Sequence, residues 1–215
     1  MKLYSYFRSS AAYRVRIALN LKGLGYETVP VHLLKDGGQQ FSESYRTLNP
    51  TQLIPTLVDG DLAIGQSIAI LEYLDETHPQ PPLLPADAAG RARVRAIAQT
   101  IACDIHPLNN LRVLRYLKND LNLDDDVRDA WYKHWIAVGL GSIEAMLAGH
   151  SATGRFCHGD TPGLADACLV PQVFNARRTK CDLSAYPTIV RIDAACAELD
   201  AFCDAAPAAQ PDSES

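Results

Sequence analysis

The stretch Tyr4-Ser-Tyr-Phe-Arg-Ser-Ser-Ala-Ala-Tyr-Arg-Val-Arg-Ile-Ala-Leu19 decides the fold, because it predicts a strand that turns directly into a helix. Residues 2–6 favour β structure, whereas apolar residues recur at helical spacing from Ala11 onward. Ser9 and Ser10 lie at the turn, where serine is a preferred helix N-cap. A helix amino terminus presents unpaired N–H groups and a partial positive charge. The turn therefore suits a thiolate, a carboxylate or a phosphate, although an ordinary capped turn explains this stretch equally well.

Size and composition exclude several classes of protein. The chain has 215 residues, 47% of them hydrophobic and 21% charged, which is enough for two small domains or one larger domain. Its net charge of −5 argues against nucleic-acid binding as a main task. No apolar run is long enough to span a membrane, and the first residues lack the apolar core of a signal peptide. The six cysteines lack zinc-site spacing, so we expect free thiols, a cytoplasmic protein and no metal.

The first part of the chain predicts the element order β-α-β-α-β-β-α. After the first helix, residues 27–33 are typical of a strand and residues 41–48 of a short helix. The polar, glycine-rich segment 35–40 between them is expected to be a mobile loop. Residues 52–64 form a predicted hairpin with an Asp-Gly turn, and Ser67 is placed to cap the helix that follows. This order matches a thioredoxin-like domain.

A proline-rich segment separates two predicted domains. We place the thioredoxin-like domain at residues 1–79, the linker at 80–89 and an all-helical domain at 90–215. Helices of this second domain are predicted over residues 90–118, with a kink at Pro107, and over 126–148, 163–177 and 187–202. The tail from about residue 205 is polar and rich in Pro and Ala, which predicts disorder. The expected fold class is an α/β thioredoxin-like domain followed by an all-α domain.

Together these motifs resemble the glutathione transferases, and more narrowly their zeta class, the maleylacetoacetate isomerases. The resemblance rests on the stretch 9–19, on Lys35-Asp-Gly-Gly-Gln-Gln40, on Ile54-Pro55 and on Gln66-Ser67, and it covers nearly the whole chain. The family has two domains, which agrees with the predicted organisation. It is usually dimeric, so the resemblance implies a homodimer.

The resemblance implies that glutathione is the cofactor. The residues implied to bind it are Ser9, Ser10, Gln40, Ile54, Pro55, Gln66, Ser67, His106 and Asn110. Ser9 and Ser10 would be catalytic, because they would hold and activate the thiol. Gln66 and Ser67 would bind the γ-glutamyl end, and Gln40 would approach the glycyl end. A cis peptide before Pro55 would leave the Ile54 backbone free for the ligand, whereas base rates alone favour trans.

The implied activity is glutathione-dependent cis–trans isomerisation of a maleyl keto acid, by thiolate addition, bond rotation and elimination. Arg8, Arg112 and Arg178 are the candidates for binding the substrate carboxylates, since guanidinium pairs with carboxylate bidentately. Arg8 also counts as catalytic because it lies in the turn. Each arginine could instead be a surface ion-pair partner, and His106 a histidine satisfied locally at a helix kink. Maleylacetoacetate and maleylpyruvate both remain open as the substrate.

The sequence departs from the family's pattern at two positions. Ala11 stands where zeta-class proteins often have cysteine, which argues against the related reductive dehalogenases. Gly163 replaces the usual Ser or Thr N-cap three residues before Asp166, in a motif we regard as structural. Two other functions remain open: a general transferase or peroxidase acting on xenobiotics or α-haloacids, and a non-catalytic interaction module. The second is disfavoured because every catalytic motif is present.

Overall fold

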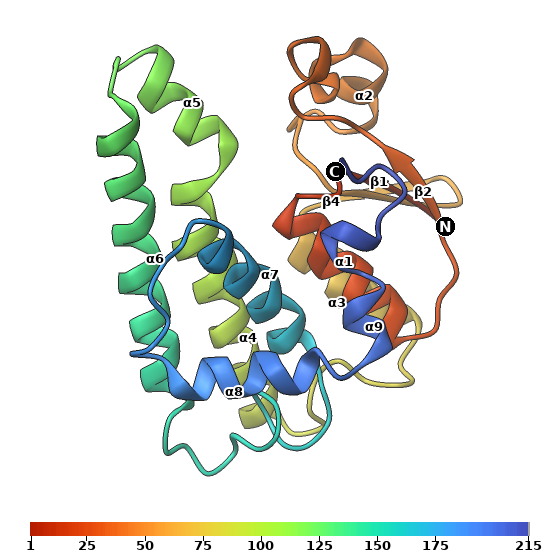
Figure 1. The fold of residues 1–215 in the computed structure, drawn as a ribbon. Coiled ribbons are helices and arrows are strands. Elements are labelled where there is room, and N and C mark those ends of the chain that lie inside the picture. Colours follow the sequence, from red (N-terminus) through yellow and green to blue (C-terminus); the bar gives the residue numbers. More distant parts are fainter. Residues whose placement is uncertain (215) are drawn as a thin grey trace. The chain divides into compact units, whose positions relative to one another are not determined.

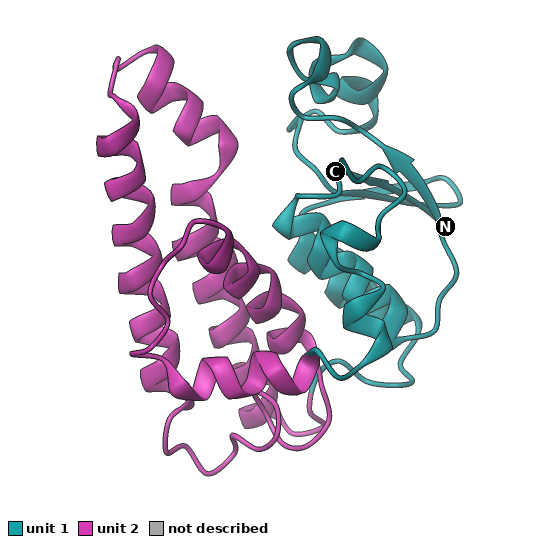
Figure 2. Cartoon of the chain, viewed as in Figure 1, with its two compact units in different colours: residues 1–84, 197–215 teal, residues 85–196 magenta. Residues whose placement is uncertain are grey.

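The computed structural model describes residues 1–214 of the chain, shown as a ribbon in Figure 1. These residues form two compact units, which Figure 2 colours separately. The first unit contains Met1–Leu84 together with the chain from Ala197 onward, and the second contains Pro85–Cys196. The boundary after Leu84 falls within the predicted linker. The return of the last residues to the first unit differs from the expected division.

The first unit is built on a four-stranded mixed sheet. Its strands are β1 (Lys2–Ser5), β2 (Glu27–Pro30), β3 (Thr56–Asp59) and β4 (Leu62–Gly65), in the order β2-β1-β3-β4. Strand β1 runs parallel to β2 and antiparallel to β3, and β3 and β4 form the predicted hairpin. A parallel pair requires a crossover, which the helix after β1 supplies. The sheet therefore places the end of β1, and the turn that follows it, at the centre of the unit.

Three helices accompany the sheet in the order that the sequence predicts. They are α1 (Ser10–Leu21), α2 (Glu43–Leu48) and α3 (Ser67–Thr77), and α1 packs against α3 (Figure 1). The apolar side chains of α1 and α3 that face the sheet are fully buried, as amphipathic helices require. Two short 3-10 turns, Lys35–Gly37 and Gln39–Phe41, replace the irregular loop expected there. The predicted thioredoxin-like domain is confirmed.

The second unit is entirely helical among the residues described. Its α-helices are α4 (Ala88–Gln99), α5 (Leu111–Asn119), α6 (Asp125–Leu147), α7 (Leu164–Arg178) and α8 (Pro187–Cys196). The helix predicted over residues 90–118 is interrupted by a π-helical turn, Thr100–Ile105, and a 3-10 turn, His106–Asn109. Pro107 explains the break, because proline donates no N–H and its ring collides with the carbonyl four residues earlier. The predicted kink is therefore a ten-residue change of helix type.

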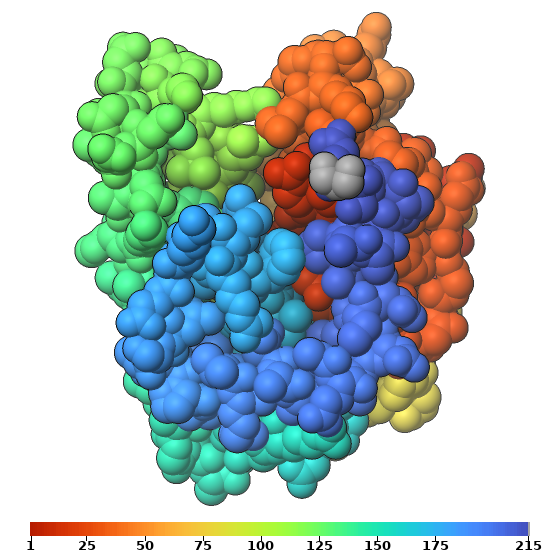
Figure 3. Space-filling view, in the orientation of Figure 1, coloured from red at the N-terminus to blue at the C-terminus, as the bar shows by residue number. Residues whose placement is uncertain are grey.

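The expectation of a disordered tail within the helical domain is wrong. The predicted helix 187–202 ends at Cys196, and a short helix, α9 (Asp200–Cys203), and a 3-10 turn, Pro207–Ala209, follow in the first unit. Figure 3 shows this final segment in dark blue on the surface of that unit. Phe202 and Ala205 are buried, and the Nε of Arg16 donates to the Ala205 carbonyl over 2.9 Å. The contacts that order the segment are to α1, so its own composition could not reveal them.

Candidate functional site

The turn between β1 and α1 places Ser9 at the amino terminus of the helix. Ser9 is the N-cap, with φ −68° and ψ 116°, and its Oγ accepts the N–H of Ala12 over 3.2 Å. A hydroxyl that already accepts a helix N–H keeps its own proton for donation. Ser10 is buried as the first residue of α1. The turn thus combines a hydroxyl donor with the positive end of a helix, which stabilises an anion.

Arg8 immediately precedes this cap and remains accessible. Its guanidinium lies 4.8 Å from the centroid of the Phe7 ring, in cation–π geometry, and 3.9 Å from the Glu214 carboxylate. The Arg8 side chain is 44% exposed, so the contact with Glu214 is weak and can be exchanged for another carboxylate. Arg8 is therefore positioned to receive an anionic ligand beside Ser9.

The Ile54–Pro55 peptide is cis, as the resemblance implies. Ladder pairing between β3 and β4 starts at Thr56, one residue after Pro55. Ile54 therefore lies outside the ladder, although it belongs to a buried cluster with Tyr6, Phe7 and Tyr45. Its backbone polar groups lie where an extended peptide-like ligand can pair with them.

Gln66 and Ser67 form a second helix amino terminus, at the start of α3. Gln66 has φ +67°, a left-handed conformation that is uncommon for residues other than glycine and that is often retained at functional sites. Ser67 is buried, and its Oγ accepts a hydrogen bond from Nη1 of Arg14 over 3.1 Å. Because the hydroxyl accepts from arginine, its proton is directed away from Arg14. Because Arg14 lies on α1, this bond joins the helix that Ser9 caps to the helix that begins at Ser67, within the same unit.

Gln40 is buried in the second 3-10 turn. Its side-chain oxygen Oε1 is inaccessible and accepts no hydrogen bond from the residues described. Gly38 has φ +116°, and a Cβ at that position would lie 2.8 Å from the same oxygen, so only glycine fits there. A buried amide oxygen without a donor is costly, which favours a ligand N–H as its partner.

In the second unit, the break after α4 gathers three of the predicted residues. The Nδ2 of Asn110 lies 3.4 Å from Nε2 of His106, and the Asn110 side chain caps α5 by accepting the N–H of Arg112 over 3.1 Å. The structure therefore joins His106, Asn110 and Arg112 at one helix start. The side chain of His106 is partly buried, so the local contact with Asn110 leaves part of its ring accessible.

Arg178 ends α7, and its guanidinium lies near the phenol of Tyr132 on α6. Burial raises the pKa of Tyr132, and the nearby Arg178 opposes that rise. The Tyr132 carbonyl accepts the Nδ2 of Asn109 over 3.1 Å. Tyr132 thus lies near Arg178 and also binds the turn that carries His106 and Asn110.

Sequence reasoning missed several of the residues that support the site. These are Arg14 and Arg16 on α1, Tyr132 on α6 and Asp212 near the end of the chain. The sequence did contain one indication that the two arginines are buried. They alternate with apolar residues on a helix that the fold requires to be buried on most sides. Both are almost completely inaccessible. A buried arginine needs acceptors, which identifies it as a structural or functional residue.

Asp166 has the structural role expected of it. Its carboxylate accepts the N–H groups of Gly163 and Cys157 over 2.9 and 2.8 Å, and so fixes the start of α7 without a hydroxyl cap. Burial raises the pKa of Asp166, and the two backbone hydrogen bonds counteract part of that rise. The Asp166 carboxylate therefore compensates for the missing Ser or Thr at Gly163, because it accepts the Gly163 N–H and ties the start of α7 to Cys157.

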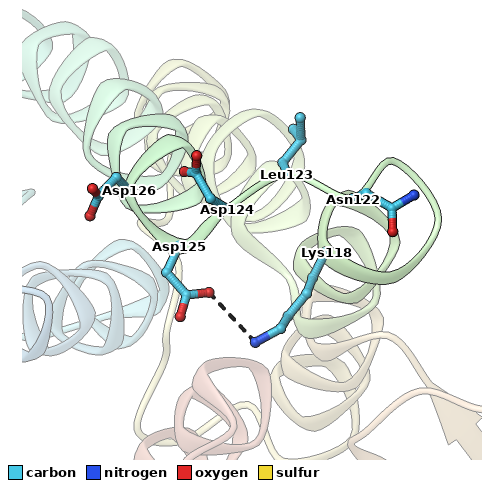
Figure 4. A pocket seen from close by; sticks show the side chains of 6 residues that line it. All are labelled: Lys118, Asn122, Leu123, Asp124, Asp125 and Asp126. Carbon is cyan, nitrogen blue, oxygen red and sulfur yellow. Dashed lines mark ion pairs between the residues drawn. The ribbon is translucent and has the colours of Figure 1, made fainter.

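A pocket at the turn between α5 and α6 is lined by none of these residues. It is lined by Lys118, Asn122, Leu123, Asp124, Asp125 and Asp126, shown in Figure 4. Lys118 and Asp125 form an exposed ion pair at 3.5 Å, while Asp124 caps α6. All three aspartates are exposed, so the pocket has the character of a solvated helix end.

Two larger features are absent from the part of the chain that the structure describes. Within residues 1–214, no helix combines the length and the apolar character needed to cross a bilayer. The same residues contain no group of three His, Cys, Asp or Glu side chains arranged to hold a metal ion.

Comparison with known proteins identifies the relatives of this chain. A family model described as the N-terminal domain of glutathione S-transferase matches residues 3–82. A probable maleylacetoacetate isomerase from Vibrio cholerae is 52% identical over 98% of this chain and 97% of its own length. A holo structure described as a maleylpyruvate isomerase, a bacterial zeta-class glutathione S-transferase, has a TM-score of 0.96 at 52% identity, with both chains fully covered.

A further solved structure was determined with ligands. It is a maleylacetoacetate isomerase from Methylobacterium extorquens AM1 with bound malonate and glutathione. It has a TM-score of 0.96 and 41% identity to this chain, and both chains are covered completely. These relatives extend over both units of the present chain.

Proposed function

Because the chain belongs to the glutathione transferases, and within them to the zeta class, we propose that it is a glutathione-dependent cis–trans isomerase of a maleyl keto acid. The observation that carries the proposal is the Ser9 hydroxyl at the amino terminus of α1, with its oxygen already bonded to the Ala12 N–H. Full-length relatives at about half identity are isomerases of this kind, and they extend over both units.

The donors and acceptors of the first unit fit glutathione. Gln66 and Ser67 at the start of α3 would bind its γ-glutamyl end, and the backbone of Ile54 before cis-Pro55 would pair with its peptide groups. Gln40, buried in the second 3-10 turn, would approach the glycyl end. Glutathione, when bound, supplies the thiolate nucleophile that adds reversibly to the conjugated double bond and so permits rotation. His106 and Asn110 are the contacts we propose from the second unit.

Ser9 activates the thiol by stabilising its ionised form. A thiol of pKa near 8.5 is mostly protonated at neutral pH, and the ionised form is the nucleophile. The Ser9 hydroxyl would donate to the sulfur, while the first N–H groups of α1, with Ser10 among them, would add the positive end of the helix. Hydrogen bonding to the charged form and a nearby positive potential both lower a thiol pKa.

The arginines would hold the substrate, because a maleyl keto acid carries two carboxylates. Arg8 lies in the catalytic turn and is accessible, so it can bind a carboxylate and stabilise the charge that develops on the substrate carbonyl. Arg178, near the Tyr132 phenol, and Arg112, in the first turn of α5, are the proposed partners in the second unit. Guanidinium groups suit this task because they bind carboxylates through two parallel hydrogen bonds.

We test the proposal by following fumaryl product formation from maleylacetoacetate and from maleylpyruvate, with maleylacetoacetate as the first choice. The protein should convert at least one acid when glutathione is present. S-methylglutathione, which lacks a free thiol, should not support the reaction. Absence of glutathione-dependent conversion of both acids would contradict the proposal. Rapid conjugation of α-haloacids without isomerisation would favour the general transferase instead.

The assembly and location of the protein are further expectations that follow from its family. We propose a homodimer in the cytoplasm, as the resemblance to the zeta class implies. Light scattering on the purified protein should give twice the mass of 23.5 kDa calculated for the chain. A monomer that retains full isomerase activity would contradict the dimer.

A further inference from the structure

The final segment of the chain makes a set of polar contacts with the catalytic turn. Asp212 and Glu214 contact the residues that follow β1. Glu214 also contacts His32 and Lys35, which follow β2. All of these residues belong to the first unit. None of the glutathione contacts proposed above involves this segment.

Both backbone polar groups of Phe7 are held from this side. The N–H of Phe7 donates to Oδ2 of Asp212 over 2.9 Å, and its carbonyl accepts from Nη2 of Arg16 over 3.0 Å. Arg16 also donates to the Ser5 hydroxyl and to the Ala205 carbonyl, so one buried guanidinium joins β1, the turn and the final segment. Phe7 lies two residues before Ser9, and fixing its peptide groups restricts where Ser9 can sit.

The segment that carries Asp212 is itself anchored. The Tyr13 hydroxyl donates to the Phe202 carbonyl over 3.3 Å, and the Asn20 amide donates to the Ala201 carbonyl over 3.0 Å. The Gln210 amide folds back onto the Asp204 and Ala206 carbonyls. Asp212 therefore projects from a segment tied along the length of α1, the same helix that Ser9 caps.

Glu214 adds charge contacts at the edge of the turn. Its carboxylate lies 2.7 Å from Nζ of Lys35, 3.1 Å from Nε2 of His32 and 3.9 Å from Nη2 of Arg8. These groups are partly exposed, so each pair contributes little stability alone. They do hold the end of the segment over the turn, which keeps Asp212 within reach of Phe7.

We propose that Asp212 is a positioning residue for the isomerase reaction: by accepting the Phe7 N–H, it fixes the Phe7–Arg8–Ser9 turn so that the Ser9 hydroxyl meets the thiol at the amino end of α1. The proposal rests on the proposed function. A carboxylate is a stronger acceptor for a backbone N–H than a neutral group. Catalytic groups lose much of their effect when they move by about an ångström, so a fixed turn has a direct kinetic value.

The test compares Asp212→Ala, Asp212→Asn and Asp204→Ala. Asp204→Ala is the matched control, because it removes an exposed carboxylate from the same segment while the Asp204 contact with Gln210 uses the backbone. Asp212→Asn keeps an oxygen that can accept the Phe7 N–H. We expect Asp212→Ala to lower kcat by about tenfold with a smaller change in the KM for glutathione. It should also move the acidic limb of the pH–rate profile to higher pH.

The expected pattern is loss in Asp212→Ala, recovery of most activity in Asp212→Asn and no change in Asp204→Ala. Thermal unfolding of each variant sets an assay temperature at which all are folded. The proposal is overturned if Asp212→Ala keeps the wild-type kcat and pH profile, or if Asp212→Asn is as impaired as Asp212→Ala.

Hydrogen exchange of the Phe7 amide separates this inference from the proposed function, because it needs neither glutathione nor substrate. Asp212→Ala should exchange this amide faster than the wild type and Asp204→Ala. Unchanged exchange would refute the role of Asp212 even in an active enzyme. A wild-type protein without isomerase activity would instead contradict the proposed function, whatever the exchange result.

Discussion

The guanidinium of Arg14 donates to the hydroxyl of Ser67 over 3.1 Å, although 53 positions separate the two residues in the chain. Arg14 lies on the helix that Ser9 caps, and Ser67 begins the helix proposed to bind the γ-glutamyl end. Both residues are almost completely buried. The bond therefore connects the helix proposed to activate the thiol with the helix proposed to bind the γ-glutamyl end, and it directs the Ser67 proton away from Arg14.

Replacing Arg14 with Met should weaken glutathione binding. The variant leaves the buried Ser67 oxygen without the Arg14 donor and removes a positive charge beside the residue proposed to bind the γ-glutamyl end. We expect the KM for glutathione to rise about tenfold, the loss typical of a hydrogen bond to a charged group, with little change in kcat at saturation. Arg46→Met, at an exposed position on α2, is the control and should leave both constants unchanged. An unaltered KM in the folded Arg14 variant would show that the bond does not serve binding.

Ser9→Ala should separate catalysis from helix capping. Loss of the hydroxyl donor should lower kcat by about 10²- to 10³-fold, as for other preorganised donors. Loss of the cap should lower the free energy of unfolding by about 1 kcal/mol. Ser42 caps α2 in the same way, accepting the Tyr45 N–H over 3.3 Å, so Ser42→Ala should destabilise similarly but remain active. Equal activities of the two variants would remove Ser9 from its proposed role.

Asp166→Asn should destabilise the second unit in a pH-dependent manner. An asparagine cannot accept both backbone N–H groups, so we expect a loss of about 1–3 kcal/mol. Burial raises the pKa of Asp166 in the folded protein above its unfolded value near 3.8. The native state then binds the proton more tightly, so this ionisation makes the wild type less stable as pH rises through the folded pKa.

The stability difference between wild type and Asp166→Asn should therefore widen as pH falls toward 3.8, because only the wild type gains from protonation. Urea unfolding at a series of pH values measures this difference directly. The Asp182→Asn variant is a control, since Asp182 is exposed and its pKa is lowered by hydrogen bonds from Ser184. A difference that narrows with falling pH would contradict the assignment for Asp166.

Alkylation should distinguish the thiols by burial. Cys103 and Cys203 are exposed, whereas Cys157, Cys168 and Cys196 are buried. Burial raises the pKa of the Cys157 and Cys196 thiols, which lowers the fraction present as reactive thiolate. Mass spectrometry after brief treatment with iodoacetamide should find label on the two exposed residues first. Early modification of the buried thiols in native protein would indicate local opening of the second unit.

The sequence by itself determined the order of elements in the first unit and the Ser9 cap of α1, whereas α3 is preceded by Gln66 as its N-cap and not by the expected Ser67. Alternation along β1, helical spacing after Ala11 and the serine cap are properties of neighbouring residues, so they can be recognised without knowing the fold. The same holds for the Asp-Gly hairpin turn and for the break at Pro107. The motifs at Ser9, Ile54 and Gln66 carried the family resemblance, and with it the proposed glutathione contacts.

Only the tertiary structure decided how the end of the chain is used. Local composition predicted disorder beyond residue 205, yet the donors that order this segment lie on α1, nearly two hundred positions earlier. The same limit applies to Arg14, Arg16 and Tyr132, whose partners are distant in sequence. Hydrogen bonds between remote residues depend on which surfaces the folded chain brings together. For that reason the residues that support the catalytic turn became visible only in three dimensions.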